Sequence, residues 1–239
     1  MNTMNRRVFL GSAAGAGAVA LSSAVIAPVL NAQGRGNSRG RATPDGAILS
    51  ELHRQIVAAT TSVKRGPSGE SLRQVAAANR IFAEWGREQE IDARVRAHVR
   101  REIGRRGKAA LIAPGFDVVE ELKIRGFDVP PGAAMTVTPA RMSALLDQAQ
   151  SETGLMSTYT ALSSRIEAQA LKIDTRLGVR PIAWQEEDEC TLIRGIRDTF
   201  EVLVLFWCAP WMVGFYEICI IVAADLAFWM AYQWVAGCG

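Results

Sequence analysis

The sequence is poor in the residues that most enzymes use for acid–base and metal chemistry. It has only two histidines, His53 and His98, among 239 residues. It contains no Ser-His-Asp or Cys-His arrangement, no glycine-rich phosphate loop and no cluster of metal ligands. His53 lacks a ligand-type residue four positions later, which excludes a zinc site of the His-Glu-x-x-His kind. We therefore expect a protein that is not an enzyme and that uses no metal, cofactor or small-molecule substrate.

Charge is absent or scarce in two long stretches. Residues 11–30 carry none, and residues 202–236 carry only Glu217 and Asp225. Residues 45–110 hold 13 Lys/Arg against 8 Asp/Glu, whereas residues 111–189 hold 7 against 12. A basic half beside an acidic half indicates that the two face each other or face different partners. The net charge of +3 does not indicate nucleic-acid binding, and we expect none.

The N-terminus has a specific motif in which Arg6 and Arg7 are followed by Phe9 and Leu10. The uncharged stretch after it is rich in Gly and Ala, and the whole of residues 1–32 resembles a twin-arginine (Tat) export signal. This resemblance implies the Tat machinery as a partner and a periplasmic, secreted or envelope destination. A retained membrane anchor is the alternative. Residues 33–44, which are rich in Gly and Arg, are expected to form a flexible linker.

Residues 45–183 have apolar positions at three- and four-residue spacing, and no segment predicts a strand. They predict an all-α bundle of five or six helices, followed by a C-terminal helical hairpin in residues 184–239. Gly66-Pro67 and Gly86 are expected to interrupt helices. Expected helix starts are Ser68 as an N-cap, Asp117 with Glu120 as a capping box, and Thr138 followed by Pro139.

The expected helix through Ile91–Ile103 is surrounded by six arginines within residues 94–106. Such a helix could bind anionic lipid or nucleic acid. The interpretation we favour is a solvated face balanced by the acidic second half of the sequence and by nearby acids, which are Glu88, Glu90, Asp92 and Glu102. His98 and Glu102 lie one turn apart, and we expect a hydrogen-bonded pair on the helix surface rather than a proton-handling dyad.

All four cysteines lie in the C-terminal segment, with gaps of 17, 10 and 18 residues between them. Two helices of nearly equal length, each about 26 Å long, would fit the outer gaps. Folded antiparallel, they would bring Cys208 beside Cys219 and Cys190 beside Cys238. We predict these two nested disulfides, which suit the oxidising compartment that export implies. The alternative is four unpaired cysteines on apolar faces.

The predicted hairpin is strongly apolar, and two interpretations of it stay open. It could be the central layer of a soluble bundle, or it could be a segment that acts on a membrane. Glu217 and Asp225 are eight residues apart on similar helix faces and would be costly in lipid unless they were protonated or partnered. We expect both carboxyls to be buried, and they are candidates for a functional role.

Two C-terminal motifs carry a second resemblance. Residues 214–219, Gly-Phe-Tyr-Glu-Ile-Cys, and the closing Gly237-Cys238-Gly239 are similar to the C-terminal part of halocin-type bacteriocin precursors. That resemblance implies a precursor with a twin-arginine leader, a neutralising body and a cysteine-bearing apolar peptide, although this chain has four cysteines where the family has many. A cut within residues 184–189 would release about fifty residues. The alternative is an envelope protein that stays one chain and uses the hairpin as core or anchor.

Overall fold

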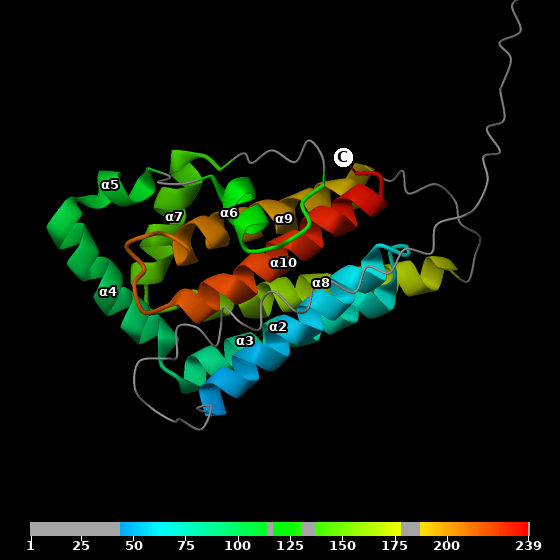
Figure 1. Ribbon diagram of the computed structural model, residues 1–239, viewed down its shortest axis with the longest axis horizontal. Coiled ribbons are helices and arrows are strands. Elements are labelled where there is room, and N and C mark those ends of the chain that lie inside the picture. Colours follow the sequence, from blue (N-terminus) through cyan, green and yellow to red (C-terminus); the bar gives the residue numbers. More distant parts are fainter. Residues whose placement is uncertain (1–43, 114–116, 131–136, 178–186, 239) are drawn as a thin grey trace, which may run out of the picture. The chain divides into compact units, whose positions relative to one another are not determined.

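The computed structural model describes residues 44–113, 117–130, 137–177 and 187–238 (Figure 1). Helix is the only regular secondary structure in these ranges, which confirms the all-α prediction. Five longer and two short helices precede the two helices of the hairpin in the described ranges. In chain order the helices are α2 (Pro44–Val63), α3 (Gly69–Glu88), α4 (Ile91–Arg106), α5 (Lys108–Ile112), α6 (Val118–Ile124), α7 (Pro139–Gln150), α8 (Met156–Leu177), α9 (Glu187–Trp207) and α10 (Tyr216–Val235).

Several sequence predictions fall on residues outside these ranges and stay predictions. They are the twin-arginine motif with Arg6, Arg7, Phe9 and Leu10, residues 33–43 of the linker, and residues 184–186 of the expected cleavage region. All the described helices belong to one compact unit, Gly40–Gly239.

Three helices begin at the residues that the sequence predicts. The Ser68 side chain accepts a hydrogen bond from the backbone N–H of Ser71 at 3.1 Å, at the start of α3. Asp117 accepts bonds from two backbone N–H groups at the start of α6. Thr138 caps α7, whose first residue is Pro139. These caps satisfy donors that have no partner within the helix, so each start is determined locally.

Gly86 does not interrupt a helix, contrary to the sequence prediction. The helix α3 runs through it to Glu88. A Cβ atom at Gly86 would lie 2.1 Å from Sδ of Met156, the first residue of α8. The glycine therefore allows α3 and α8 to approach closely, which is a tertiary requirement that the local sequence does not reveal.

The start of α8 is capped from another helix. Oδ1 of Asp92, on α4, accepts hydrogen bonds from the backbone N–H groups of Leu155 at 2.6 Å and Met156 at 3.2 Å. Gly154 has φ +63°, and a Cβ atom there would lie 2.1 Å from the Asp92 carboxyl carbon. Asp92 thus contacts the start of α8 and makes no ion pair with the arginines of its own helix within the described ranges.

The central element of the bundle is α10. It packs against α2 and α9, while α3 packs against α8 and α2 (Figure 1). Every residue from Ile218 to Gln233 is buried. A helix that is apolar on all sides needs such an enclosure in water, because each large apolar side chain gains about 1.5–3 kcal/mol from burial. Among the described helices α10 alone is long and apolar enough to cross a membrane, and 89% of its most apolar window is buried.

The basic and acidic halves of the sequence meet in the fold. Within the described residues, four ion pairs join residues 45–110 to residues 111–189, which is the first of the two alternatives that the charge pattern left open. Each pair is at least partly exposed and contributes little to stability on its own. The pairs are Lys64–Asp128 at 2.7 Å, Arg80–Glu167 at 2.8 Å, Lys108–Asp147 at 2.6 Å, and Arg73–Asp174.

Candidate functional site: the disulfide-closed hairpin

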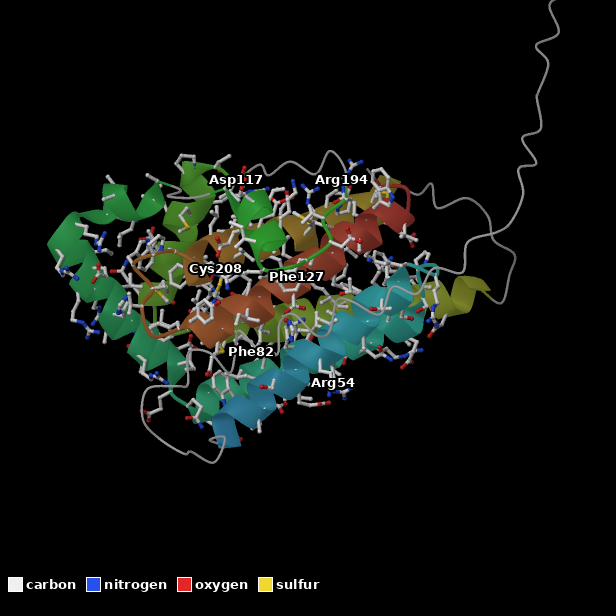
Figure 2. All side chains as sticks on the ribbon, viewed as in Figure 1. Arg54, Phe82, Asp117, Phe127, Arg194 and Cys208 are labelled. Atoms are coloured by element: carbon white, nitrogen blue, oxygen red, sulfur yellow. A yellow bond between two sulfur atoms is a disulfide. The ribbon has the colours of Figure 1, made fainter. Side chains whose placement is uncertain are left out.

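The helices α9 and α10 form a hairpin that is closed by a disulfide at each end. The outer bond joins Cys190 to Cys238, with 5.2 Å between their Cα atoms. The inner bond joins Cys208 to Cys219, with 4.9 Å between their Cα atoms. Cys208, labelled in Figure 2, directly follows α9. The pairing is the nested one that the cysteine spacing predicts, and no free cysteine occurs in the described residues.

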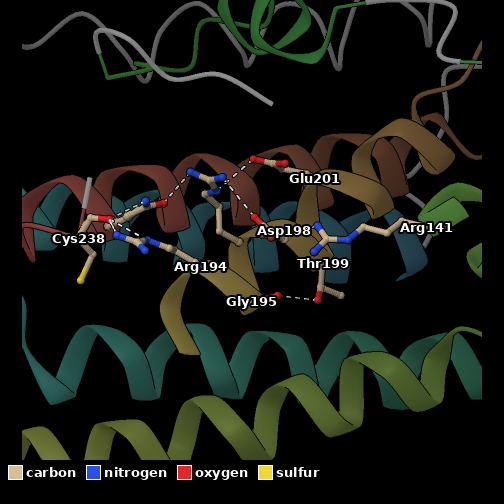
Figure 3. A network of polar contacts seen from close by, with 9 residues as sticks. Arg141, Arg194, Gly195, Asp198, Thr199, Glu201 and Cys238 are labelled. Atoms are coloured by element: carbon tan, nitrogen blue, oxygen red, sulfur yellow. Dashed lines mark hydrogen bonds and ion pairs between the residues drawn. The ribbon is translucent and has the colours of Figure 1, made fainter. Parts of the chain in front are cut away.

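A polar network holds the chain end at the outer disulfide (Figure 3). Nε and Nη2 of Arg194 donate to the carbonyl oxygen of Cys238 at 3.2 and 3.1 Å. The same oxygen accepts a bond from Nε2 of Gln233 at 3.0 Å. Arg197 donates in turn to Oε1 of Gln233 at 2.8 Å. The polar edge of α9, formed by Arg194, Arg197, Asp198 and Glu201, therefore stabilises the end of the hairpin through Arg194 and Arg197.

The same polar edge continues into the interior of the bundle. Glu201 is fully buried, and its Oε1 lies 3.0 Å from Nε of Arg197. Asp198, one residue after Arg197, pairs with Arg141 of α7 at 3.0 Å (Figure 3). These contacts bind α9 both to α10 and to the body, so the hairpin is attached by ionic as well as apolar contacts.

The other end of the hairpin is held by aromatic packing instead. The loop between α9 and α10 contains Trp211 and Phe215, and both lie against α4. Nε2 of His98 lies 2.6 Å from the carbonyl oxygen of Trp211, and the two rings are stacked. Cζ of Arg94 lies 5.6 Å from the centre of the Phe215 ring, which is a cation–π arrangement.

These contacts correct the prediction of a His98–Glu102 pair. His98 turns to the hairpin loop, while the carboxylate of Glu102 pairs with Arg105 at 2.7 Å and Arg106 at 2.8 Å. Sequence spacing placed His98 and Glu102 on neighbouring positions of one helix. Because the loop and the two arginines offer each side chain a better partner, the pair does not form.

Asp225 lies in the middle of α10 and is 1% exposed. Its Oδ1 accepts a hydrogen bond at 3.1 Å from Nδ2 of Asn79, on α3. Burial raises the pKa of Asp225 well above its usual range, and the Asn79 bond lowers it only in part. The carboxyl therefore keeps its proton at pH values at which an exposed aspartate is charged.

A protonated Asp225 would bring a hydrogen-bond donor to the surroundings of Asn79, where the amide oxygen lacks one. The Asn79 amide nitrogen also donates to the carbonyl oxygen of Val75 at 3.0 Å, and its Oδ1 is buried with no hydrogen-bond partner among the described residues. A carboxylic acid supplies a donor for such an acceptor, whereas a carboxylate does not. Burial also raises the pKa of Tyr159, on α8, and charge on Asp225 would raise it further.

Glu217 is exposed, contrary to the prediction that both acids are buried. Eight residues turn a helix by about 80° beyond two full turns and separate the two carboxyls by about 12 Å along the axis, so the two acids meet different surroundings. Glu217 lies in the first turn of α10 beside the exposed Tyr216, whereas every residue around Asp225 is buried. An acid in this position interacts favourably with the helix dipole, so it has a structural reason to be there.

Sequence reasoning missed Asn79 as a partner of Asp225. The signal was a polar residue on the apolar stripe of α3, between Val75 and Phe82. The two partners are 146 residues apart, so only the fold shows that they meet. In the described part of the chain no three His, Cys, Asp or Glu side chains are grouped to hold a metal ion, and the expected absence of a metal stays a prediction.

The chain matches no protein-family model, no curated protein and no solved structure. The hairpin, its two covalent closures and its buried acid are therefore the features from which a function is inferred.

Proposed function

We propose that this protein is an exported, non-enzymatic precursor whose helical body shields a membrane-active hairpin. The observation that carries the proposal is α10, which has the length and composition of a membrane span but is enclosed by helices of its own chain. At 1.5 Å per residue its 20 residues extend about 30 Å, the thickness of a bilayer hydrocarbon core. The layout is similar to that of halocin-type bacteriocin precursors.

The chemistry of Asp225 suits both environments of the hairpin. In the bundle the carboxyl is buried opposite Asn79 and keeps its proton. In a lipid core a charged aspartate would be expensive, whereas a protonated one is far cheaper. The hairpin therefore need not carry a charge at the centre of α10 into the membrane. Glu217, in the first turn of α10, would stay at the interface.

The disulfides make the hairpin a unit that survives removal from the body. Cutting the chain before Cys190 leaves both bonds inside the released fragment, which then holds α9 and α10 together covalently. A cut between Cys190 and Cys238 would not separate its two pieces. The connection between α8 and α9, residues 178–186, is thus the place where one cleavage frees the whole hairpin.

A second candidate function is that of an envelope protein that is never cleaved. The packing of α10 favours it, because the Asn79–Asp225 bond and the shared apolar core join the hairpin to the body as in a permanent fold. The hairpin would then be the structural centre of a binding or envelope protein. The two candidates differ in whether a fragment is released.

The first experiment measures intact masses in culture supernatant and membrane fractions, with and without reduction. The precursor hypothesis predicts a fragment of about fifty C-terminal residues, whose mass rises by about four units when its two disulfides are reduced. Recovery of the mature chain alone, at every growth phase, would support the envelope protein instead.

The second experiment tests membrane activity directly. A specific protease site replaces residues 178–186, and a matched variant has the same site in residues 131–136, where a cut leaves α7 and α8 attached to the hairpin. Only the first variant should release dye from lipid vesicles after cleavage. If the released hairpin, purified with both disulfides intact, causes no leakage, the membrane-active function is wrong.

A further inference from the structure

The loop between α9 and α10 presents an apolar tip to solvent. Val213 is 77% exposed, which is the highest value among the large apolar side chains of the described residues. Pro210 and Gly214 beside it are exposed as well. Trp211 and Phe215, by contrast, are only 7% exposed, because they pack against α4. The loop is thus anchored by its aromatic side chains and points its aliphatic residue outward.

The helix that anchors this loop is the most basic one in the sequence. At about 100° per residue, Arg94, His98, Arg101 and Arg105 fall within about 60° of one another around α4. His98 and Arg94 in this stripe contact the loop directly. Arg106, on the neighbouring side of α4, lines a cavity of about 160 Å³ together with Pro210 and Trp211 of the loop. Arginines therefore border the apolar tip.

The acids that were expected to neutralise these arginines do so only in part. Glu102 pairs with Arg105 and Arg106, and Asp92 is occupied by the start of α8. Arg94 and Arg101 are exposed and have no ion pair within the described ranges. The apolar tip is therefore bordered by two arginines that have no ion pair within the described ranges, Arg94 and Arg101, and by Arg105, which shares Glu102 with Arg106.

We propose that the loop 209–214 together with Arg94, Arg101 and Arg105 is a docking surface for an anionic lipid membrane. The inference rests on the proposed function, since it states how the intact precursor reaches the membrane on which the hairpin acts. Arginines attract anionic headgroups, and an exposed aliphatic side chain enters the interface. Docking in this way places the inner disulfide end of the hairpin against the bilayer before any release.

The burial of the aromatic residues argues against nucleic acid as the partner. Proteins that bind single strands combine basic residues with aromatic faces on which the bases stack. Trp211 and Phe215 are the aromatic rings nearest the arginines, but they are buried against α4 and offer no free face. Val213 is the exposed residue instead, and a valine side chain has no ring on which a base can stack.

Glu217 tests whether charge governs the binding of this surface, because its charge is opposite to that of the arginines. It is exposed in the first turn of α10, and the neighbouring Tyr216 ring lies 4.9 Å from Cζ of Arg125. Glu217 is the one carboxylate in residues 208–217, and it would repel anionic headgroups. Its removal should therefore strengthen membrane binding, whereas removal of the arginines should weaken it.

The experiment is co-sedimentation of the intact chain with two kinds of vesicle. One is made of equal parts phosphatidylglycerol and phosphatidylcholine, and the other of phosphatidylcholine alone. The protein should bind the anionic vesicles, and high salt should weaken this binding. Each arginine near an anionic surface changes the partition coefficient by about fivefold, so R94Q/R101Q should lower it by about 25-fold.

Three further variants make the measurement specific. V213D should lower binding at an unchanged fold, and E217Q should raise it several-fold. The matched control R54Q/R165Q removes two exposed arginines from α2 and α8 and should leave binding close to that of the unmodified protein. Arg54 is labelled on α2 in Figure 2. Circular dichroism and thermal unfolding check that each variant is folded.

The outcomes separate this inference from the proposed function. Equal binding to both kinds of vesicle, an equal loss in R54Q/R165Q, or tighter binding to a DNA or RNA oligonucleotide than to anionic vesicles would each overturn the docking surface. The released hairpin lacks α4, so its leakage activity does not depend on these arginines. Leakage without docking refutes this inference alone, and docking without leakage refutes the proposed function alone.

Discussion

A disulfide closes each end of the hairpin, but the non-covalent contacts at the two ends are of opposite kinds. At the outer disulfide, Arg194 and Arg197 direct hydrogen bonds to the chain end and to Gln233. At the inner disulfide, the loop rests on His98 through rings and a single backbone carbonyl. The outer end is thus polar and tied to charges, while the inner end is apolar with cations around it. This asymmetry gives the hairpin a direction, and in the proposed docking the inner end would meet the membrane.

The largest expected effect comes from the disulfides. The outer bond spans 48 residues of sequence and the inner bond 11. Because a larger closed loop restricts the unfolded chain more, replacing both outer cysteines by serine should cost about 4 kcal/mol and replacing both inner ones about 3 kcal/mol. Urea unfolding of the oxidised proteins measures both values. A larger loss in the free energy of unfolding for the inner pair than for the outer pair would contradict this expectation from chain entropy.

The second prediction concerns the polar group between the two ends, Asp225. Its pKa is raised in the folded state, so the unfolded chain releases a proton that the folded chain keeps. The stability contribution of the neutral acid is complete below the ordinary aspartate pKa and is lost as the pH rises towards the raised one. D225N keeps the shape and an Asn79 partner but does not titrate. It should be more stable than the unmodified protein at about pH 8, with a smaller difference at about pH 4.

The control for this prediction is E217Q. Glu217 is exposed on the same helix, so its replacement should leave the pH dependence of unfolding unchanged. Chemical unfolding at several pH values measures both variants. If the free energy of unfolding depends on pH in D225N as it does in the unmodified protein, Asp225 does not keep its proton on folding.

The third prediction tests the inner end. H98F keeps a ring that can stack on Trp211 but removes the hydrogen-bond donor, which leaves the Trp211 carbonyl without this bond. The loss should be about 1–2 kcal/mol in urea unfolding, and proteolysis within residues 209–214 should become faster. H98Q retains a donor and should recover part of the stability. A loss as large in H98Q as in H98F would show that a hydrogen-bond donor at this position is not enough to explain the stability.

The smallest expected effect is at the outer end. Arg194 is exposed, so its bonds to the Cys238 carbonyl compete with water. R194A should cost about 0.5–1 kcal/mol, less than H98F, and should leave the disulfide intact. A loss of several kcal/mol by urea unfolding would show that the polar network, and not the disulfide, holds the chain end.

Local signals account for the part of the fold that the sequence predicts. Ser68 and Thr138 cap helices through hydrogen bonds within three residues, so their role is visible in the neighbouring sequence. The cysteine spacing predicts the hairpin because two helices of equal length bring equal gaps into register. The apolar character of α10 predicts either an enclosed helix or a membrane-active one, and the fold shows an enclosed helix without the sequence indicating which helices enclose it.

Contacts between distant segments account for what the sequence does not predict. Asp92 caps α8 from 63 residues away, and His98 binds the loop at Trp211 from 113 residues away. Gly86 seemed a helix break because the local pattern does not reveal Met156 beside it. The exposure of Glu217, beside the buried Ile218 and Cys219, depends on which side of the first turn of α10 is covered. Each of these follows from packing between elements, which periodicity along one element does not encode.

In each disulfide one cysteine residue is buried and the other is partly exposed to solvent. Cys219 and Cys238 are 1% and 2% exposed, whereas Cys208 and Cys190 are half-buried. A thiolate that exchanges with either bond must approach from the accessible side, so it would form its mixed disulfide with Cys208 or Cys190. The buried partner would then act as the resolving thiol. Oxidation of a chain that is already folded would thus follow the same route at both ends of the hairpin, and mass spectrometry of trapped intermediates should find the adduct on these two cysteines.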